Sequence, residues 1–84
     1  MSYRLLFLRR AQKELASLPD PIYGRVKAAV ADLGDDPRPR YSRKLRSREG
    51  YRMRVGDYRV IYGIDDDQRL VTILDIGHRS DIYR

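Results

Sequence analysis

The first part of the chain carries its apolar side chains at the spacings of one strand followed by two helices. Residues 3–8 are apolar-rich and short, which predicts a strand. Residues 10–18 place apolar side chains three or four positions apart, which predicts a helix that Pro19 ends. We expect a second helix with Asp20 as its N-cap and Pro21 at its first helical position. The apolar stripe of this second helix consists of Ile22, Val26, Ala29, Val30 and Leu33, and it ends at Gly34.

Apolar and polar residues alternate in the second half of the chain, with the period of two that is typical of strands. Residues 51–55 and 58–65 flank Gly56 and Asp57, a two-residue loop suited to a type I′ or type II′ hairpin. A polar turn then leads into a last strand over residues 70–78. The predicted order is an N-terminal strand, an antiparallel helix pair and a three-stranded antiparallel meander, with all strands in one sheet.

The fold class follows from this order of elements. Residues 35–42, which contain two prolines, are expected to form the loop between the helices and the meander. Helices that cover one face of such a sheet make an α+β domain. With 84 residues the chain has the length of one domain, so we assign residues 1–84 to a single domain.

The two-residue loop determines which residues lie opposite each other in the hairpin. Side chains alternate between the two faces of a sheet, and residues paired across strands share a face. The face expected to contact the core carries Tyr51, Met53, Val55, Tyr58, Val60 and Tyr62. The other face carries Arg52, Arg54 and Arg59.

This second face is expected to bind phosphate. Arg54 is predicted to lie directly opposite Arg59, and like charges at paired positions cost stability. Three arginines on one face with no acid among them favour a site that receives a phosphate. The alternative is that Asp75 or Asp81, from the neighbouring strand and the tail, neutralises these arginines.

The positive charge of the chain is concentrated in residues 38–59. The net charge at pH 7 is +6, and this segment alone holds nine basic and two acidic residues. Fifteen of the 18 basic residues are arginine, whose planar guanidinium binds a phosphate through two N–H groups. We therefore expect this segment to bind a polyanion, and RNA in particular, the alternative being a solvated basic face.

The rest of the composition bears on the location of the protein and on whether it binds a metal or another cofactor. The longest apolar stretch, residues 5–8, is far too short to span a membrane, and the chain has no cysteine. A cytoplasmic location without a membrane partner is expected. The single histidine and the scattered aspartates do not have the spacing of a metal site, so we expect neither a metal nor another cofactor.

Two segments resemble the RelE/ParE toxin superfamily. They are residues 51–62, Tyr-Arg-Met-Arg-Val-Gly-Asp-Tyr-Arg-Val-Ile-Tyr, and residues 76–83, Ile-Gly-His-Arg-Ser-Asp-Ile-Tyr. The resemblance extends over the whole chain, including residues 11–18 and the Lys44-Leu45-Arg46 segment. It implies the toxin half of a type II toxin–antitoxin module with a RelE-like fold, similar to that of microbial RNases. RelE-type members cleave mRNA in the ribosomal A site, whereas ParE-type members poison DNA gyrase.

Five positions favour the RelE branch. RelE-type enzymes carry two basic residues on the first hairpin strand, an arginine on the second, an arginine after the last strand and a tyrosine near the C-terminus. Well-known members have lysines at the first two positions, and an arginine cannot release a proton as a lysine can, so a charge role alone is expected there. In this chain the five positions are occupied by Arg52, Arg54, Arg59, Arg79 and Tyr83.

The resemblance implies a metal-free, ribosome-dependent endoribonuclease in which a ribose 2′-OH attacks the adjacent phosphorus. Tyr83 is the expected general base, because nearby guanidiniums would lower the pKa of its hydroxyl from about 10. Arg59 and Arg79 are expected to hold the non-bridging oxygens, and Arg54 to stabilise the tyrosinate and the developing charge. His78 is the candidate general acid. The expected RNA-binding residues are Arg52, Lys44, Arg46 and Arg48.

The expected partners are mRNA, small-subunit ribosomal RNA and a cognate antitoxin. Some relatives continue into a C-terminal helix, and this sequence ends at Arg84 without one. An acidic, partly disordered antitoxin is therefore expected to inhibit the toxin by covering the basic face.

Several alternatives remain open at the level of sequence. His78 could be an exposed loop histidine, and Tyr83 could anchor the C-terminus to the core. Tyr41 and Tyr51 either stack on bases or pack in the core, and core packing is favoured for Tyr51. The alternative functions are a ParE-like gyrase poison and a non-catalytic antitoxin-binding corepressor.

Overall fold

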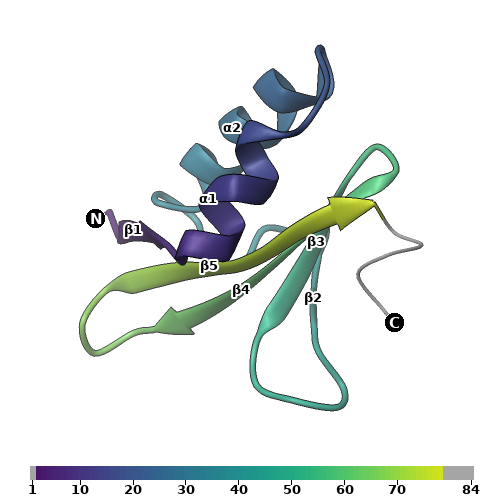
Figure 1. Ribbon diagram of the computed structural model, residues 1–84. Coiled ribbons are helices and arrows are strands. Elements are labelled where there is room, and N and C mark those ends of the chain that lie inside the picture. The colour runs from purple at the N-terminus through teal and green to yellow at the C-terminus, as the bar shows by residue number, and fades with distance from the viewer. Residues whose placement is uncertain (1, 79–84) are drawn as a thin grey trace.

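Residues 2–78, which the computed structural model describes, form a five-stranded sheet with two helices on one of its faces (Figure 1). In chain order the elements are β1 (Arg4–Phe7), α1 (Arg9–Ala16), α2 (Ile22–Asp32), β2 (Ser42–Lys44), β3 (Tyr51–Val55), β4 (Tyr58–Asp65) and β5 (Leu70–His78). The strand order is β1-β5-β4-β3-β2. β1 runs parallel to β5, and the other neighbouring strands are antiparallel. The predicted α+β fold class is confirmed.

β3 and β4 pair in the register that the sequence predicts. Val55 lies opposite Tyr58 and Arg54 opposite Arg59. Gly56, the first residue of the loop, has a φ of 61°, in the left-handed region that glycine adopts without steric cost. Positive φ at the first loop residue alone is the type II′ pattern, whose twist matches that of the flanking strands. The loop therefore fixes which hairpin residues face the helices.

Strand β2 is an element that the sequence interpretation did not predict. The expected loop over residues 35–42 ends at Ser42, where β2 begins. β2 has three residues, two of them charged, and it pairs with β3 at the edge of the sheet. So short a strand has no apolar alternation, and its pairing depends on backbone groups that every residue supplies. Four strands therefore follow the helices in residues 2–78, where three were expected.

The helix ends also differ from the prediction. α1 ends at Ala16, two residues before the expected end, and α2 begins at Ile22. Pro21 occupies the N-cap position of α2 with φ −88° and ψ 4°, and no side chain caps this helix. The predicted N-cap role of Asp20 is therefore wrong, because the residue after it takes the cap position.

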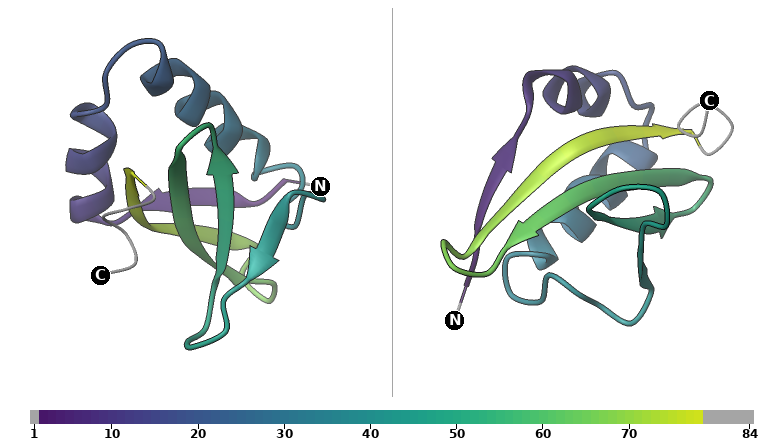
Figure 2. Two further views of the ribbon diagram at one scale, coloured as in Figure 1. Left: turned by 90° about the vertical axis from the view of Figure 1, so that its right-hand side faces the viewer. Right: turned by 90° about the horizontal axis from the view of Figure 1, so that it is seen from below.

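The core lies between the helices and the sheet face that they cover. Figure 2 shows the same arrangement from two further sides, with no helix of residues 2–78 over the other face of the sheet. Tyr62 is fully buried, and its hydroxyl donates to the carbonyl oxygen of Pro37 at 2.8 Å. Burial raises the pKa of the Tyr62 hydroxyl, which therefore remains a donor. The buried cluster comprises Ala11, Ile22, Val26, Val30, Leu33, Met53, Val55, Val60, Tyr62, Val71, Ile73 and Ile76.

Glu14 attaches α1 to β5. β1 pairs with β5 only as far as the pair Phe7↔Ile73. Further along β5, the backbone N–H of Ile76 donates to Oε1 of Glu14 at 2.8 Å. A buried backbone donor without an acceptor is costly. The Glu14 carboxylate therefore supplies the acceptor for the Ile76 N–H at a position that β1 does not reach.

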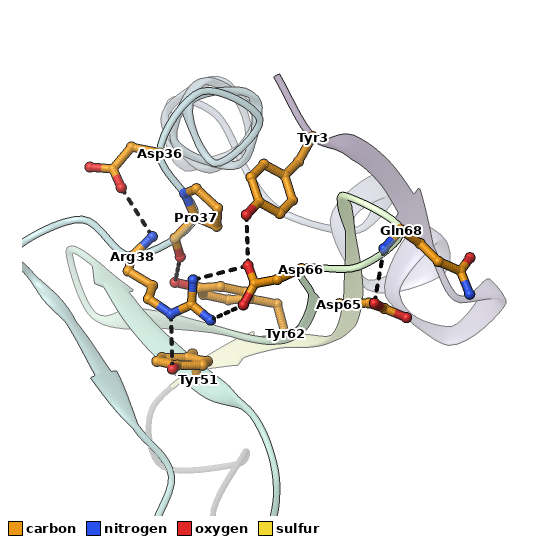
Figure 3. Close-up of polar contacts among 9 residues, drawn as sticks. All are labelled: Tyr3, Asp36, Pro37, Arg38, Tyr51, Tyr62, Asp65, Asp66 and Gln68. Atoms are coloured by element: carbon orange, nitrogen blue, oxygen red, sulfur yellow. Dashed lines mark hydrogen bonds and ion pairs between the residues drawn. The ribbon is translucent and has the colours of Figure 1, made fainter. Parts of the chain in front are cut away.

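A polar cluster of Tyr3, Arg38, Tyr51 and Asp66 joins four separate segments of the chain (Figure 3). The Arg38 guanidinium donates to both carboxylate oxygens of Asp66, at 3.2 and 2.9 Å, and its Nε donates to the Tyr51 hydroxyl at 3.0 Å. The Tyr3 hydroxyl donates to Asp66 at 2.6 Å, which raises the pKa of that hydroxyl. We call these four residues the Arg38 cluster.

Neither helix within residues 2–78 has the length and apolar composition needed to cross a membrane.

Asp66→Asn is expected to destabilise the protein near neutral pH and to have little effect in strong acid. Hydrogen bonds, first from Arg38 and then from Tyr3, lower the pKa of the Asp66 carboxyl in the folded state. The charged carboxylate therefore contributes stability above the unfolded pKa of about 3.9, and this contribution is lost as the pH falls through the lower folded pKa. Urea unfolding of both proteins at neutral and strongly acidic pH measures the difference.

Asp67→Asn is the matched control for this experiment. Asp67 is an exposed neighbour in the same turn, and its side chain makes no hydrogen bond or ion pair to the rest of residues 2–78. A stability loss in Asp66→Asn that is the same at every pH, or one equal to that of the control, would contradict the proposed charge dependence.

Candidate nucleic-acid interface

Arginines from three strands lie together on the sheet face opposite the helices, which we call the arginine face. Arg43 of β2 pairs with Arg52 of β3, and Arg54 of β3 pairs with Arg59 of β4. The residue between the two β3 arginines, Met53, is buried in the core. The predicted placement of three arginines on one face is confirmed, and the structure adds Arg43 to them.

These side chains line a cavity of about 230 Å³, the arginine pocket. This volume is below the roughly 300–1,000 Å³ typical of pockets that enclose a small molecule. A shallow cationic depression of this size suits one phosphate and part of a nucleotide of a longer polyanion. The lining residues are Tyr41, Arg43, Arg52, Met53, Arg54 and Arg59.

Arg54 opposite Arg59 is the electrostatic centre of this site. Cross-strand partners have Cβ atoms about 5 Å apart, so backbone pairing places the two arginines side by side on this face. Arginine cannot relieve the repulsion by losing its proton. An anion bound between the two side chains would reduce the repulsion and form charge-assisted hydrogen bonds to both.

An acidic residue also lies on the arginine face. Asp75 of β5 pairs with Ile61, which in turn pairs with Arg52, so the three residues share a row. The Asp75 carboxylate forms ion pairs with Arg10 at 2.8 Å and with Arg48 at 3.6 Å. Neither of these two arginines lines the pocket. The ion pairs of Asp75 thus link α1 and the β2–β3 connection to the sheet.

The other predicted RNA-binding residues do not gather at the arginine pocket. Lys44 pairs with Tyr51, so its register assigns it to the opposite face from Arg43. It lines a separate cavity of about 340 Å³ that also includes Arg38 and Glu49. Arg46 and Arg48 are exposed in the connection between β2 and β3.

His78 lies away from the arginine pocket. It pairs with Tyr58, and the two rings meet edge to face with centroids 5.5 Å apart. Tyr58 packs against the core, so this pair belongs to the helix-covered face. His78 lines a different cavity of about 300 Å³ together with Glu14. The structure therefore does not bring the candidate general acid into the arginine pocket.

Arg79 and Tyr83, the other two predicted catalytic residues, and Asp81 lie outside the described residues. Gly77 pairs with Arg59, so β5 ends beside the row that contains Arg54 and Arg59. Within residues 2–78, no three His, Cys, Asp or Glu side chains come together in an arrangement that could hold a metal ion.

Arg43 is a pocket residue that the sequence interpretation did not assign to the site, and Tyr41, which was left open between base stacking and core packing, also lines the pocket. The unpredicted strand β2 explains Arg43, because only its pairing with Arg52 places it on the arginine face. Tyr51 packs against the core, which is the role that the sequence favoured for it. Its ring stacks on Tyr62 with centroids 5.9 Å apart, and its hydroxyl accepts a hydrogen bond from Arg38.

Comparison with known proteins identifies a matching family model and a similar toxin. Residues 5–83 match the family model described as the ParE toxin of the type II toxin–antitoxin system parDE. Toxin RelG of Mycobacterium tuberculosis is 38% identical over 87 aligned positions, which cover 100% of this chain and 99% of that toxin.

Two solved structures are similar to the whole fold. One is the toxin–antitoxin complex RelBE2 of Mycobacterium tuberculosis, with a TM-score of 0.83 and 33% identity over 94% of this chain and 100% of the matched chain. The other is the archaeal RelE–RelB complex of Pyrococcus horikoshii, with a TM-score of 0.83 and 33% identity over 96% and 99% of the two chains.

Arg54→Gln is expected to stabilise the fold and at the same time to weaken RNA binding. Removing one of two facing like charges should raise the free energy of unfolding by about 0.5 kcal/mol. Losing one phosphate contact should reduce the slope of log affinity against log salt concentration by about 1. Urea unfolding and RNA titrations at several salt concentrations measure the two effects.

Arg4→Gln is the matched control, because Arg4 is an exposed strand arginine on β1, at the far edge of the sheet. It should leave the salt slope unchanged. A variant Arg54→Gln that is less stable than the wild type would contradict the repulsion across the hairpin.

Proposed function

This chain belongs to the ParE toxin family of type II toxin–antitoxin systems, within the RelE/ParE superfamily, and we propose that it is an endoribonuclease that cleaves mRNA in the ribosomal A site. It is a RelE-type toxin of a toxin–antitoxin module. The observation that carries the proposal of cleavage is the arginine pocket, in which Arg52, Arg54 and Arg59 line one cavity. Such a set of fixed positive charges suits a reaction at a phosphate.

The proposed reaction is an in-line attack by a ribose 2′-OH on the adjacent phosphorus. The bond from the 2′-oxygen to phosphorus forms as the bond from phosphorus to the 5′-oxygen breaks, which leaves a 2′,3′-cyclic phosphate and a free 5′-OH. Tyr83 takes the proton of the 2′-OH. The leaving 5′-oxygen takes a proton from solvent, because the register of His78 assigns it to the other face of the sheet.

The arginines are proposed to act by charge. Arg59 and Arg79 hold the non-bridging oxygens, Arg54 stabilises the tyrosinate and the charge that develops on the phosphorane, and Arg52 positions the backbone. The pairing of Arg54 with Arg59 supports this division of roles, since it places both side chains on the same face before substrate binds. Preorganised charge of this kind stabilises a transition state without a reorganisation cost during the reaction.

We propose that an acidic antitoxin covers the arginine face. Two similar toxins were solved in complexes with antitoxins, one named a RelBE2 complex and the other a RelE–RelB complex. The exposed Arg40 and Arg46 are proposed to add positive charge beyond the pocket, which suits small-subunit ribosomal RNA in the active state. One surface would then serve both partners in turn, so the antitoxin and the ribosome compete.

A gyrase-poisoning activity is the second candidate function, because the matching family model is described as a ParE toxin. It requires a protein surface that binds gyrase rather than a nuclease site. The grouping of four arginines around one pocket favours the nuclease, since like charges at paired positions suit a phosphate bound between them.

Tyr83→Phe and Arg79→Ala are expected to slow mRNA cleavage by at least about 100-fold while leaving the fold intact. A general base contributes roughly 10²–10⁴-fold to a rate, and the phenylalanine variant keeps the ring but cannot accept the proton. Purified wild type and variants are mixed with ribosomes programmed with a defined mRNA, and the cuts are mapped by primer extension. The wild type should produce cuts in phase with the codons.

Tyr23→Phe is the matched control, because it removes a tyrosine hydroxyl from α2, on the helix side of the sheet. It should cleave as the wild type does. Intact mRNA with the wild type, together with DNA breaks trapped on gyrase, would contradict the nuclease proposal and support a gyrase poison. A variant Tyr83→Phe as toxic as the wild type would instead favour a function without catalysis.

A further inference from the structure

Tyr41 is an exposed aromatic residue at the arginine pocket. Its side chain lies in the loop directly before β2 and lines the pocket together with Arg43, Arg54 and Arg59. The residue is 49% exposed, although a tyrosine ring in a small domain gains stability by packing in the core. Packing in the core, one of the two roles left open by the sequence, is therefore wrong for Tyr41.

The backbone on both sides of Tyr41 is held by hydrogen bonds. Ser42 donates twice to the carbonyl oxygen of Pro39, from its N–H at 2.9 Å and from its hydroxyl at 2.7 Å. The Arg43 guanidinium donates to the carbonyl oxygens of Arg40 at 2.9 Å and of Ser42 at 2.8 Å. Tyr41 is thus presented from a fixed turn, and its ring has only two side-chain torsions to order on binding.

The start of the same loop is anchored to the core and to the Arg38 cluster. The buried Tyr62 hydroxyl holds the carbonyl oxygen of Pro37, and the Arg38 N–H donates to the Asp36 carboxylate at 3.1 Å. Arg38 itself is bonded to Asp66 and Tyr51. The exposure of Tyr41 is therefore a property of an ordered loop.

An RNA phosphate held by the pocket arginines has a nucleoside on each side of it. Arginines recognise the phosphate, but the flat face of a base needs an aromatic surface, on which stacking is favourable and tolerant of sequence. Tyr41 is the aromatic residue among the side chains that line the pocket in residues 2–78. We propose that Tyr41 is the stacking platform for a nucleobase adjacent to the phosphate in the arginine pocket.

This inference rests on the proposed function for its choice of RNA as the ligand, and it adds a subsite with a preference. Stacking strength grows with the area of the base, so purines should be favoured over pyrimidines at this position by a few-fold. The preference concerns one base only, because a single ring lies at the pocket edge. A hydroxyl on that ring is not needed for stacking.

Tyr41→Ala is expected to weaken binding of a short RNA by about 10-fold, and Tyr41→Phe to bind as the wild type does. Alanine substitution of a stacking residue costs roughly 5- to 150-fold in affinity per base. The probe is a tetranucleotide with 2′-O-methyl riboses, which cannot be cleaved, at low salt. Leu6→Ala is the matched control, since Leu6 is also 49% exposed but lies on β1 at the far edge of the sheet.

A second measurement identifies the base that contacts the ring. An abasic nucleotide is placed at each position of the tetranucleotide in turn. At the stacked position it should weaken wild-type binding by about the same factor as Tyr41→Ala, and it should weaken binding to Tyr41→Ala hardly at all. At the other positions the two changes should be independent.

Tyr41→Trp provides a direct spectroscopic signal, because the chain contains no tryptophan. The introduced indole should be quenched by the purine tetranucleotide and much less by the same probe with the abasic nucleotide at the stacked position. Thermal unfolding of each variant establishes that it is folded.

The outcomes separate this subsite from the proposed nuclease. Equal affinity of wild type and Tyr41→Ala, additive effects of the variant and every abasic probe, or no binding by the wild type would each overturn the stacking role. If the coupling is found but ribosome-bound mRNA stays intact, the base subsite stands and the nuclease proposal fails. If mRNA is cut equally by wild type and Tyr41→Ala and no coupling is found, the nuclease proposal stands and the base subsite fails.

Discussion

The rest of the structure depends on the register between β3 and β4. The Gly56-Asp57 loop allows one pairing, in which Met53 and Val60 lie in the core and Arg54 and Arg59 lie on the open face. A slip by one residue would bury the arginines and expose the apolar side chains. Burial of the core side chains thus supplies the free energy that keeps two like charges in direct opposition, and function is tied to fold by a single constraint.

Different residues supply the arginine pocket and the ion pairs on the same face of the sheet. The strands place Arg52, Arg54 and Arg59 around the pocket, while Asp75 on the same face is engaged by Arg10 and Arg48. The ion pairs of Asp75 link α1 and the β2–β3 connection to the sheet.

The sequence was sufficient wherever side-chain periodicity or turn chemistry decides the structure. The two helices, the hairpin register and the shared face of three arginines follow from apolar spacing and from one two-residue loop. Strand β2 could not be predicted, because three residues at a sheet edge are held by backbone pairing, and Arg43 was missed with it. The Arg38 cluster joins residues up to 63 positions apart, for which a single sequence carries no signal. His78 was assigned from its neighbours in the chain, and the register of β5 assigns it to the other face.

The hydrogen bond of Glu14 to β5 affects how strands of other chains can pair with this molecule. The stretch of β5 that β1 leaves uncovered is a potential template for a further strand from another chain, and such open edges promote aggregation. The Glu14 carboxylate occupies the Ile76 N–H there, so an incoming strand would have to displace a charged acceptor before it could pair. The acceptor is matched to a backbone group, so the protection does not depend on which side chain stands at position 76. A small domain with a strongly basic open face thereby carries a charged obstacle on its β5 edge that a strand of another copy would have to displace.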